Sequence, residues 1–184
     1  MERNNEMEFK IQRAKQSDAE ELFAVMMAVW EQLEDKSLYY ADDLAYIKKC
    51  IQTEGIVLKV LDLQGKIAAF LLMYIPKDDA EHLGHMCKMK KEQREATVYM
   101  DSIAVLPKYR GYGLQQRLLK EGENCEILPE KRYLMATVAP ENEHSLHNFL
   151  SLGYYIVCET KKYGGLQRFV LLKERSGEDE KRGD

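Results

Sequence analysis

Apolar residues along this chain follow two spacings, one typical of helices and one typical of strands. From Leu22 they recur every three or four positions through Val25, Met26 and Val29, which predicts a helix of about four turns with one buried face. Short runs with period-two alternation or continuous apolar character predict strands. Strands are predicted at residues 9–13, 56–63, 66–75, 97–106, 133–138, 154–160 and 167–172, and further helices at residues 42–52, 111–124 and 142–152.

This order of elements predicts an α/β (α+β) fold, a mixed sheet with helices covering both of its faces. The chain shows no internal repeat and no shift of composition that would mark a second domain, so residues 1–174 are predicted to form a single domain. Residues 176–184 contain no large apolar side chain. Residues 175–184 are therefore predicted to be a frayed polar tail.

Composition narrows the classes of partner. The 184 residues are 45% hydrophobic and 32% charged, enough apolar content for the core of one domain. The formal net charge of −4 provides no cationic field for gripping DNA or RNA, so no nucleic-acid partner is expected. The amino terminus is rich in charge, and no apolar run approaches the ~18 residues of a membrane span. A cytoplasmic protein without a membrane partner is predicted.

The spacing of potential metal ligands is unfavourable for a metal site. The four cysteines, at positions 50, 87, 125 and 158, lie too far apart for a zinc knuckle or a redox pair and are expected to be separate reduced thiols. His82, His85 and Cys87 fall within six residues, but no second cluster completes a four-coordinate set. Residues 77–95 are polar and are predicted to be a solvated loop, and no metal is expected.

A glycine-containing turn carries the strongest chemical signal. Residues 101–116 run from a strand through Arg110, Gly111 and Gly113 into the start of a helix. Glycines let the backbone approach a ligand, and a helix amino terminus offers unpaired N–H groups and partial positive charge, so the turn suits phosphates. The third glycine of a dinucleotide fingerprint is absent because Gln116 stands there, and no P-loop Gly-Lys-Ser/Thr follows.

The turn resembles the acetyl-CoA signature of the GNAT-type N-acetyltransferases. That signature is Gln or Arg, two residues, Gly, one residue, then Gly or Ala, and here Lys108, Gly111 and Gly113 occupy its places, with Lys108 as a departure that keeps the charge. A second block of the family begins about 29 residues later, counted from Gly113. Its positions are filled by Asn142, Ser145, Phe149, Gly153 and Tyr154.

The resemblance implies an architecture and a donor site. The central sheet would be mostly antiparallel with about seven strands, and the strands ending at Leu106 and Ala139 would splay apart to admit the pantetheine arm of acetyl-CoA, the acyl donor. The backbone of Ile103, Ala104 and Val105 would pair with pantetheine, and Asn142 would hydrogen-bond the arm. The pyrophosphate would be lined by Lys108, Arg110, Gly111, Tyr112, Gly113, Leu114 and Gln115.

The resemblance also suggests catalytic and acceptor residues. Asp101 lies where the family often has an acidic residue and is the candidate base. Backbone N–H groups near Val105 would bind the developing oxyanion. Many members carry a tyrosine acid at the place of Phe149, which cannot supply a proton; Tyr154, the candidate acid, Tyr155, Ser145 or water would have to replace it. The acceptor pocket is expected at the loop of Tyr39 and Tyr40 and at residues Tyr163 to Arg168, and the rings of Tyr39, Tyr40 and Tyr163 suit a cation.

The predicted function is transfer of an acetyl group from acetyl-CoA to a primary amine of a small molecule or peptide, by direct attack of the amine. A non-catalytic acyl-CoA-binding module remains an alternative, since it would share every donor residue. A structural interaction protein is a third, and it predicts no stabilisation by CoA. The late β-rich edge gives weak support for a homodimer.

Overall fold

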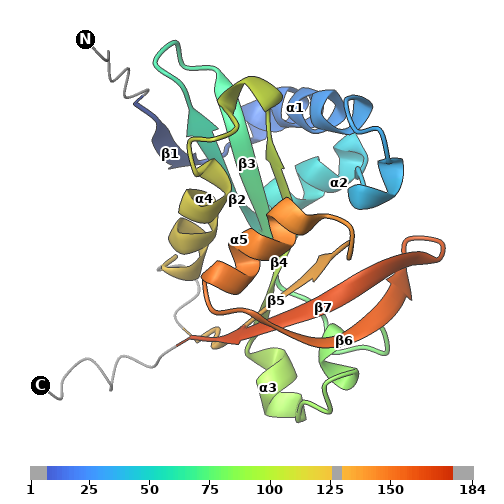
Figure 1. Ribbon diagram of the computed structural model, residues 1–184. Helices are drawn as coiled ribbons and strands as arrows, with labels where there is room; N and C mark the ends of the chain where they lie inside the picture. Colours follow the sequence, from blue (N-terminus) through green and yellow to red (C-terminus); the bar gives the residue numbers. More distant parts are fainter. Residues whose placement is uncertain (1–7, 126–129, 176–184) are drawn as a thin grey trace, which may run out of the picture.

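The computed structural model describes residues 8–125 and 130–175 (Figure 1). The strands are β1 (Lys10–Arg13), β2 (Gly55–Leu61), β3 (Ile67–Tyr74), β4 (Thr97–Val105), β5 (Tyr133–Val138), β6 (Tyr155–Lys162) and β7 (Leu166–Glu174). The α-helices are α1 (Ala19–Glu31), α2 (Leu44–Lys49), α3 (Lys91–Glu95), α4 (Leu114–Glu123) and α5 (Glu143–Ser151). A five-residue π-helical segment, Cys50–Glu54, continues α2.

The strands form one sheet in the order β1-β2-β3-β4-β5-β7-β6. Every neighbouring pair is antiparallel except β4 and β5, which are parallel. The predicted α/β (α+β) class, with a mixed, mostly antiparallel sheet of about seven strands, is confirmed.

Helices cover both faces of the sheet, because the central strands β2 and β3 carry apolar side chains on both faces. On one face α1 and α2 bury the predicted stripe, and on the other α4 and α5 pack (Figure 1). The first core contains Leu22, Met26, Ile47, Phe70 and Leu72, and the second contains Leu71, Met100, Leu118, Leu119 and Phe149. The alternation of Phe70, Leu71 and Leu72 between the two cores places β3 at the centre of both.

The parallel strands β4 and β5 pair over only three residues each. Thr97, Val98 and Tyr99 lie opposite Tyr133, Leu134 and Met135, and no pairing follows, although β4 continues to Val105 and β5 to Val138. Strand β4 stays paired with β3 and β5 stays paired with β7 beyond this point. The splayed strands that the family resemblance implied are therefore confirmed.

A β-bulge interrupts β4 at the place where the two strands part. Ser102 lies opposite Leu72 and Met100 opposite Met73, so Asp101 has no partner residue on β3. An extra residue of this kind changes which face the following side chains point to. Met100 and Ile103, three residues apart, consequently both pack toward the core under α4.

The prediction of a solvated loop at residues 77–95 is wrong. This segment contains a 3₁₀ turn, Leu83–His85, and helix α3, and it buries His82, Leu83 and Met89. Leu83 and Met89 pack with Tyr99, Met135, Val170 and Leu172 in a third, smaller core. Apolar residues spaced irregularly among charged ones gave no periodic signal for this packing.

The last described residues of the chain follow directly from strand β7. Strand β7 ends at Glu174, and the backbone N–H of Arg175 donates to the carbonyl of Arg132 at 2.7 Å. Arg175 therefore belongs with the folded part of the chain. The rest of the predicted tail, residues 176–184, lies outside the described residues.

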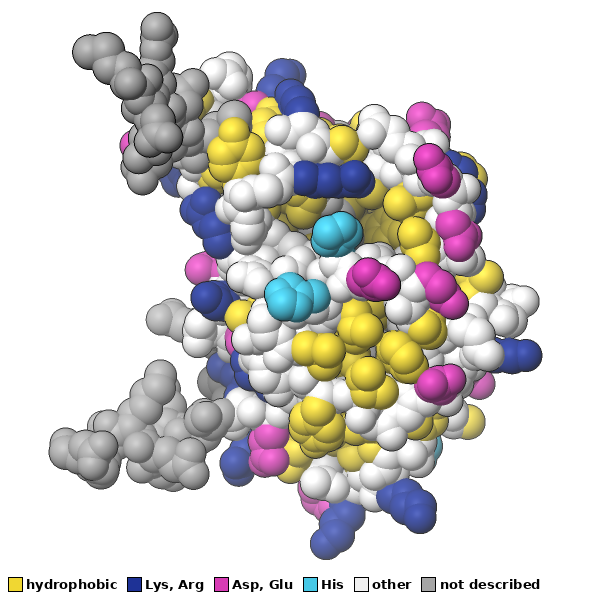
Figure 2. All heavy atoms as spheres, in the orientation of Figure 1, with side chains coloured by type: hydrophobic (Ala, Val, Ile, Leu, Met, Phe, Trp, Pro, Cys, Tyr) yellow, Lys and Arg dark blue, Asp and Glu magenta, His cyan; other side chains and the backbone are white. Residues whose placement is uncertain are grey.

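One surface carries a group of apolar side chains over β6 and β7, beside α5 (Figure 2). Large apolar residues exposed in this part of the chain are Leu150 on α5 and Tyr155 and Ile156 on β6, although Tyr155 and Ile156, as consecutive strand residues, point to opposite faces of the sheet. Strand β6 is the edge of the sheet next to β7.

Candidate functional site

The amino terminus of α4 is an open anion-binding end. Its N-cap is Gly113, with φ +68°, and no side chain caps the first turn. Gly111 has φ +85°, and a Cβ atom at either glycine would meet nothing within 4 Å. The glycines are therefore required by the left-handed backbone and not by crowding, and they leave space beside the free N–H groups of the helix.

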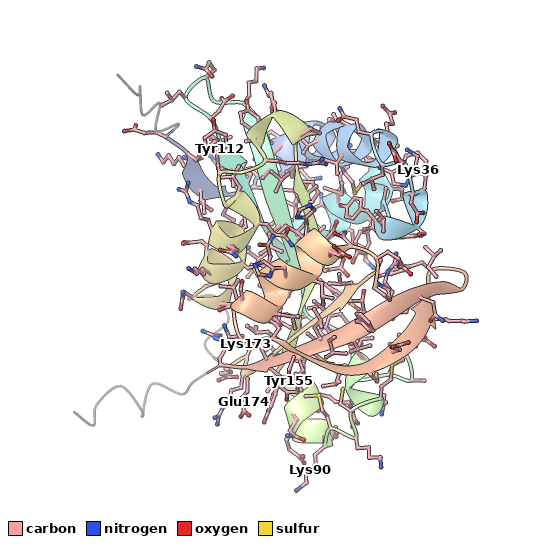
Figure 3. The ribbon with its side chains drawn as sticks, viewed as in Figure 1. Lys36, Lys90, Tyr112, Tyr155, Lys173 and Glu174 are labelled. Atoms are coloured by element: carbon pink, nitrogen blue, oxygen red, sulfur yellow. The ribbon has the colours of Figure 1, made fainter. Side chains whose placement is uncertain are left out.

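Positive side chains surround this end of α4. Lys108 and Arg110 are exposed, and no acidic residue occupies the first turn of the helix. The Lys108 ammonium lies 4.5 Å from the centre of the Tyr109 ring. Tyr112 is 42% exposed, packs edge-on against Phe9, and projects at the end of the molecule where α4 begins (Figure 3). The amino terminus of a helix carries partial positive charge, and cations beside it add to its attraction for a bound anion.

The unpaired edges of β4 and β5 line a gap that leads to this turn. Ile103 and Val105 pack toward the core under α4, and Ala104 packs toward α1 and α2. Their side chains are thus committed to the protein, while the backbone edge of β4 that faces β5 has no ladder partner. Buried backbone N–H and C=O groups need hydrogen bonds, so this edge can accept an extended ligand with amide groups.

Three residues predicted to bind acetyl-CoA use their side chains for contacts within the protein. Leu114 is buried in the core. The Gln115 side chain donates to Ser145 Oγ and accepts from Asn148 Nδ2, both at 2.9 Å, which joins α4 to α5. Asn142 caps α5 by accepting from the Ser145 N–H at 3.2 Å and donates to the Leu38 carbonyl at 3.4 Å. Leu114 and Gln115 therefore offer backbone groups to a ligand.

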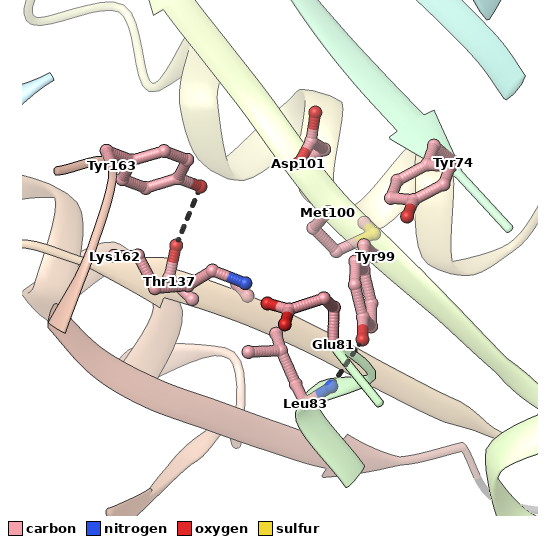
Figure 4. A pocket seen from close by; sticks show the side chains of 10 residues that line it. Tyr74, Glu81, Leu83, Tyr99, Met100, Asp101, Thr137, Lys162 and Tyr163 are labelled. Atoms are coloured by element: carbon pink, nitrogen blue, oxygen red, sulfur yellow. Dashed lines mark hydrogen bonds between the residues drawn. The ribbon is translucent and has the colours of Figure 1, made fainter. Parts of the chain in front are cut away.

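A cavity of about 190 Å³ opens where β4 and β5 part (Figure 4). Met100 and Asp101 on β4, and Ala136 and Thr137 on β5, are the first residues after the pairing ends, and all four line the cavity. The remaining lining residues are Tyr74, Glu81, Leu83, Tyr99, Lys162 and Tyr163. The gap between the strands consequently runs from this cavity to the turn before α4.

Asp101 is the carboxylate at the apex of the gap. The Tyr46 hydroxyl on α2 donates to its Oδ2 at 2.8 Å. Burial raises the pKa of Asp101, while the Tyr46 bond and the Lys162 charge oppose that rise. Burial, together with the charges of Asp101 and Asp43, raises the pKa of Asp42 to about 7. The bulge, α2 and the loop before it thus bring two proton-binding carboxyls to one site.

Of the predicted acceptor tyrosines, Tyr163 lines the cavity, and Tyr39 and Tyr40 contact residues beside it. The Tyr40 and Tyr163 rings stack with centroids 4.3 Å apart. The Tyr39 hydroxyl lies 2.5 Å from Ser102 Oγ, next to Asp101 in sequence. Tyr163 has φ +54°, unusual for a residue with a side chain, and its hydroxyl lies 3.4 Å from Thr137 Oγ1. Strain held by surrounding contacts is typical of functional turns.

A buried arginine holds these tyrosines in place. Arg168 on β7 is 3% exposed, and the centre of its guanidinium lies 5.4 Å from the Tyr163 ring centroid. Its Nη2 donates to the Ser37 carbonyl at 2.8 Å, and its Nη1 donates to the Gln167 carbonyl at 2.7 Å. Among the described residues it forms no ion pair. Arg168 therefore ties β7 to the loop that carries Tyr39, Tyr40 and Asp42.

The structure places Phe149 and Tyr154 in the core. Phe149 is 2% exposed, and Tyr154 packs edge-on against it at 4.9 Å between centroids. Burial, followed by the charge of the neighbouring Glu123 carboxylate and a hydrogen bond to it, raises the pKa of Tyr154. Tyr154 does not line the cavity. Its role as an acid stays a prediction.

His82, His85 and Cys87 do not converge. His82 Nδ1 accepts from the Gly84 N–H at 2.9 Å, whereas the His85 ring bonds the Asp79 carbonyl. The described residues contain no group of three or more His, Cys, Asp or Glu side chains arranged to hold a metal ion.

Three residues of the site were not predicted from the sequence: Asp42, Tyr46 and Lys162. Asp42 had a weak signal, because it stands two residues after the Tyr39-Tyr40 pair. Tyr46 lies on α2 and Lys162 on β6, and only the fold brings them to Asp101 and Tyr163. Arg168 lies at the end of the predicted acceptor segment 163–168, and its guanidinium does reach Tyr163.

Comparison with solved structures shows the same fold at low sequence identity. A GNAT-family acetyltransferase from Streptococcus pneumoniae matches 92% of this chain and 100% of its own, at 21% identity and a TM-score of 0.64. The ribosomal-protein-S18-alanine N-acetyltransferase from Escherichia coli matches 94% and 98%, at 15% identity and a TM-score of 0.68. A phosphinothricin acetyltransferase from Sinorhizobium meliloti, in complex with AcCoA, matches 94% and 92%, at 15% identity and a TM-score of 0.68.

Comparison by sequence is more decisive. A search among curated proteins gives no match. The family model described as "Acetyltransferase (GNAT) family" matches residues 17–154, a range that holds α1, the bulge, the glycine turn and α5. With a family match over most of its length, and with the splayed strands and the open helix end that its sequence predicts, the chain belongs to the GNAT acetyltransferase family.

Proposed function

We propose that the protein transfers the acetyl group of acetyl-CoA to the nitrogen of a primary amine, carried by a small molecule or a peptide. One observation carries the proposal: the gap between β4 and β5 joins an open helix end, suited to phosphates, to a cavity with a buried carboxylate. The AcCoA complex of the similarly folded S. meliloti enzyme supports the choice of donor.

The residues at the gap fit such a donor. The N–H groups at the start of α4, with Lys108 and Arg110, would hold its phosphates, and the free edge of β4 at Ile103, Ala104 and Val105 would pair with its amides. Acetyl-CoA supplies an activated acetyl thioester at the cavity. Backbone N–H groups around Val105 would stabilise negative charge on the acetyl oxygen.

Asp101 would take the proton of the acceptor. An alkyl amine with a pKa near 10.4 is neutral in only about one molecule in 2,000 at pH 7. A base is most effective when its pKa lies near the working pH, and burial moves the pKa of Asp101 upward. The Tyr46 hydrogen bond fixes the orientation of the carboxylate.

The departing sulfur needs no tyrosine in this scheme. Phe149 carries no proton, and Tyr154 lies outside the cavity lining. A thiol with a pKa near 8.5 is an acceptable leaving group as its thiolate.

The aromatic residues Tyr39, Tyr40 and Tyr163 would bind the acceptor. The cavity has a volume of about 190 Å³, which suits a small molecule or the end of a peptide. Tyr74, Tyr99 and Tyr163 give its wall aromatic faces that attract a cation.

The non-catalytic acyl-CoA-binding module keeps one observation in its favour, the apolar Phe149 at the usual place of the acid. A module that only binds acyl-CoA would have no need of the Asp101 carboxylate, which the bulge in β4 places at the cavity.

Assembly and location stay predictions. The expected homodimer would form through β6, where Tyr155 and Ile156 are exposed. No helix in residues 8–125 or 130–175 has the length and apolar character to cross a membrane, and the cytoplasmic location rests on the sequence alone.

The first test is release of CoA thiol from acetyl-CoA in the presence of a panel of primary amines. Amine-dependent release is expected, and Asp101→Asn should lower kcat/KM about 100-fold because the general base is lost. The Kd of acetyl-CoA should stay within about twofold. Asp43→Asn is the matched control, since Asp43 is exposed and caps α2 through a bond that asparagine can also make. Slow release that is independent of every amine would favour the binding module.

The second test concerns pH and stability. The pKa of Asp42 is raised from 3.8 to about 7 in the fold, so between these values the folded state holds a proton that the unfolded chain has lost. This carboxyl therefore makes stability fall as pH rises from about 4 to 7. The free energy of unfolding, measured in urea, should fall less in Asp42→Asn than in the parent as pH rises from 4.5 to 8. Parallel pH profiles would contradict the assignment.

The third test removes the Arg168 bond to Ser37. Arg168→Met should raise hydrogen exchange of the amides at residues 37–43 and raise the KM of the best amine about tenfold, with an unchanged acetyl-CoA Kd, because a charged hydrogen bond no longer holds the loop. Arg13→Met, at an exposed position on β1, is the control. An unchanged exchange rate at residues 37–43 would show that Arg168 does not hold the loop.

A further inference from the structure

Lys162 points into the acceptor cavity, although it lies at the end of an edge strand. Lysines on edge strands usually extend into water. Here the side chain is only partly exposed and lines the cavity together with Asp101 and Thr137. Figure 4 shows it extending inward from the turn that carries Tyr163. The sequence analysis gave this residue no role.

The cavity thus contains charges of both signs, from Lys162 and Asp101, that do not form a direct ion pair with each other. In the described part of the chain no carboxylate forms an ion pair with the Lys162 ammonium. Its charge nevertheless acts on Asp101. Asp101 already accepts a hydrogen bond from Tyr46 and presents its charge on the β4 side of the cavity.

This arrangement is unfavourable for an acceptor that carries only positive charge. Before it loses its proton, an alkylammonium ion would be attracted by Asp101 and repelled by Lys162 within the same small space. A molecule that brings an anionic group with its amine satisfies both charges. Charge-assisted hydrogen bonds of this kind are among the stronger polar contacts that a protein can make.

We infer that the acceptor is a small zwitterion such as an amino acid, whose amine meets Asp101 and whose carboxylate, or similar anion, binds Lys162. The inference rests on the proposed function and names its substrate class. The cavity volume of about 190 Å³ matches a molecule of this size. Lys162 is then a specificity-determining residue, because it separates amino acids from simple amines and diamines.

A Glu81–Lys162 ion pair is the arrangement that would compete with binding of an anionic group by Lys162. It lines the cavity from the segment before α3, and Figure 4 shows its carboxylate on the side toward Lys162. Glu81 is exposed, so solvent screens its charge more than that of the buried Asp101. If Glu81 held Lys162 as an ion pair, Asp101 would be left alone and plain amines or diamines would be preferred.

The test compares matched acceptors in the thiol-release assay. Glycine, β-alanine and 4-aminobutyrate carry a carboxylate, ethylamine, propylamine and butylamine lack one, and ethylenediamine and 1,3-diaminopropane carry a second amine. The best amino acid should exceed its matched alkylamine in kcat/KM by about 10- to 100-fold. Lys162→Met should abolish that preference, mainly through KM, while Lys162→Arg should retain most of it.

Two further variants keep the result interpretable. Lys161→Met removes an exposed lysine that does not line the cavity, and the preference should persist. Glu81→Gln should leave the preference for amino acids in place; if it changes the ratio as Lys162→Met does, the two residues act as a pair and the inference is overturned. The acetyl-CoA Kd of each variant reports on folding and on the donor site.

The remaining outcomes separate this inference from the proposed function. Alkylamines or diamines used as well as amino acids would overturn the zwitterionic acceptor and leave acetyl transfer to amines intact. Acetyl-CoA binding without amine-dependent release across the whole panel would overturn both.

Discussion

Beyond Tyr99 and Met135 the parallel strands β4 and β5 stop pairing, and the backbone groups along two strand edges lose their partners in the sheet. Unpaired N–H and C=O groups inside a protein are costly. The fold keeps each strand in place from its other side, since β3 holds β4 and β7 holds β5. The gap is therefore a stable feature, and its free edges are available to a ligand that carries amides of its own.

The same parting of the strands organises the chemistry at both ends of the gap. At its wide end, the turn after β4 leads into α4 with a left-handed Gly113 and without a side-chain cap, so the helix presents free N–H groups. At its narrow end, the bulge turns Asp101 toward Tyr46 and the cavity. A regular β3–β4 ladder at residue 101 would have removed the extra residue. Lys162, Tyr163 and Arg168 reach this point from β6, the turn and β7.

The sequence was sufficient for most of the fold because its periodicity was strong. The stripe beginning at Leu22 predicts a buried helix face and the continuous apolar run of β3 predicts a buried strand, and these residues are buried. The glycine turn at Arg110 to Gly113 predicts an open helix end from backbone chemistry alone. The loop prediction for residues 77–95 was wrong because the buried Leu83 and Met89 stand among charged residues and their spacing is not periodic. The bulge could not be predicted from the sequence, because one extra residue changes the register of the strands and does not require particular amino-acid types. Asp42 and Lys162 look like surface charges in the sequence and acquire roles only where distant elements meet.

In the proposed complex, acetyl-CoA lies in the gap between β4 and β5 with its phosphates at α4. Hydrogen–deuterium exchange measured with and without saturating acetyl-CoA reports on this placement. Slower exchange is expected at the amides of residues 101–105 and 111–116, with no change along β1 and β2, where the strands are already paired. Protection confined to other segments, or no protection despite saturating acetyl-CoA, would contradict it.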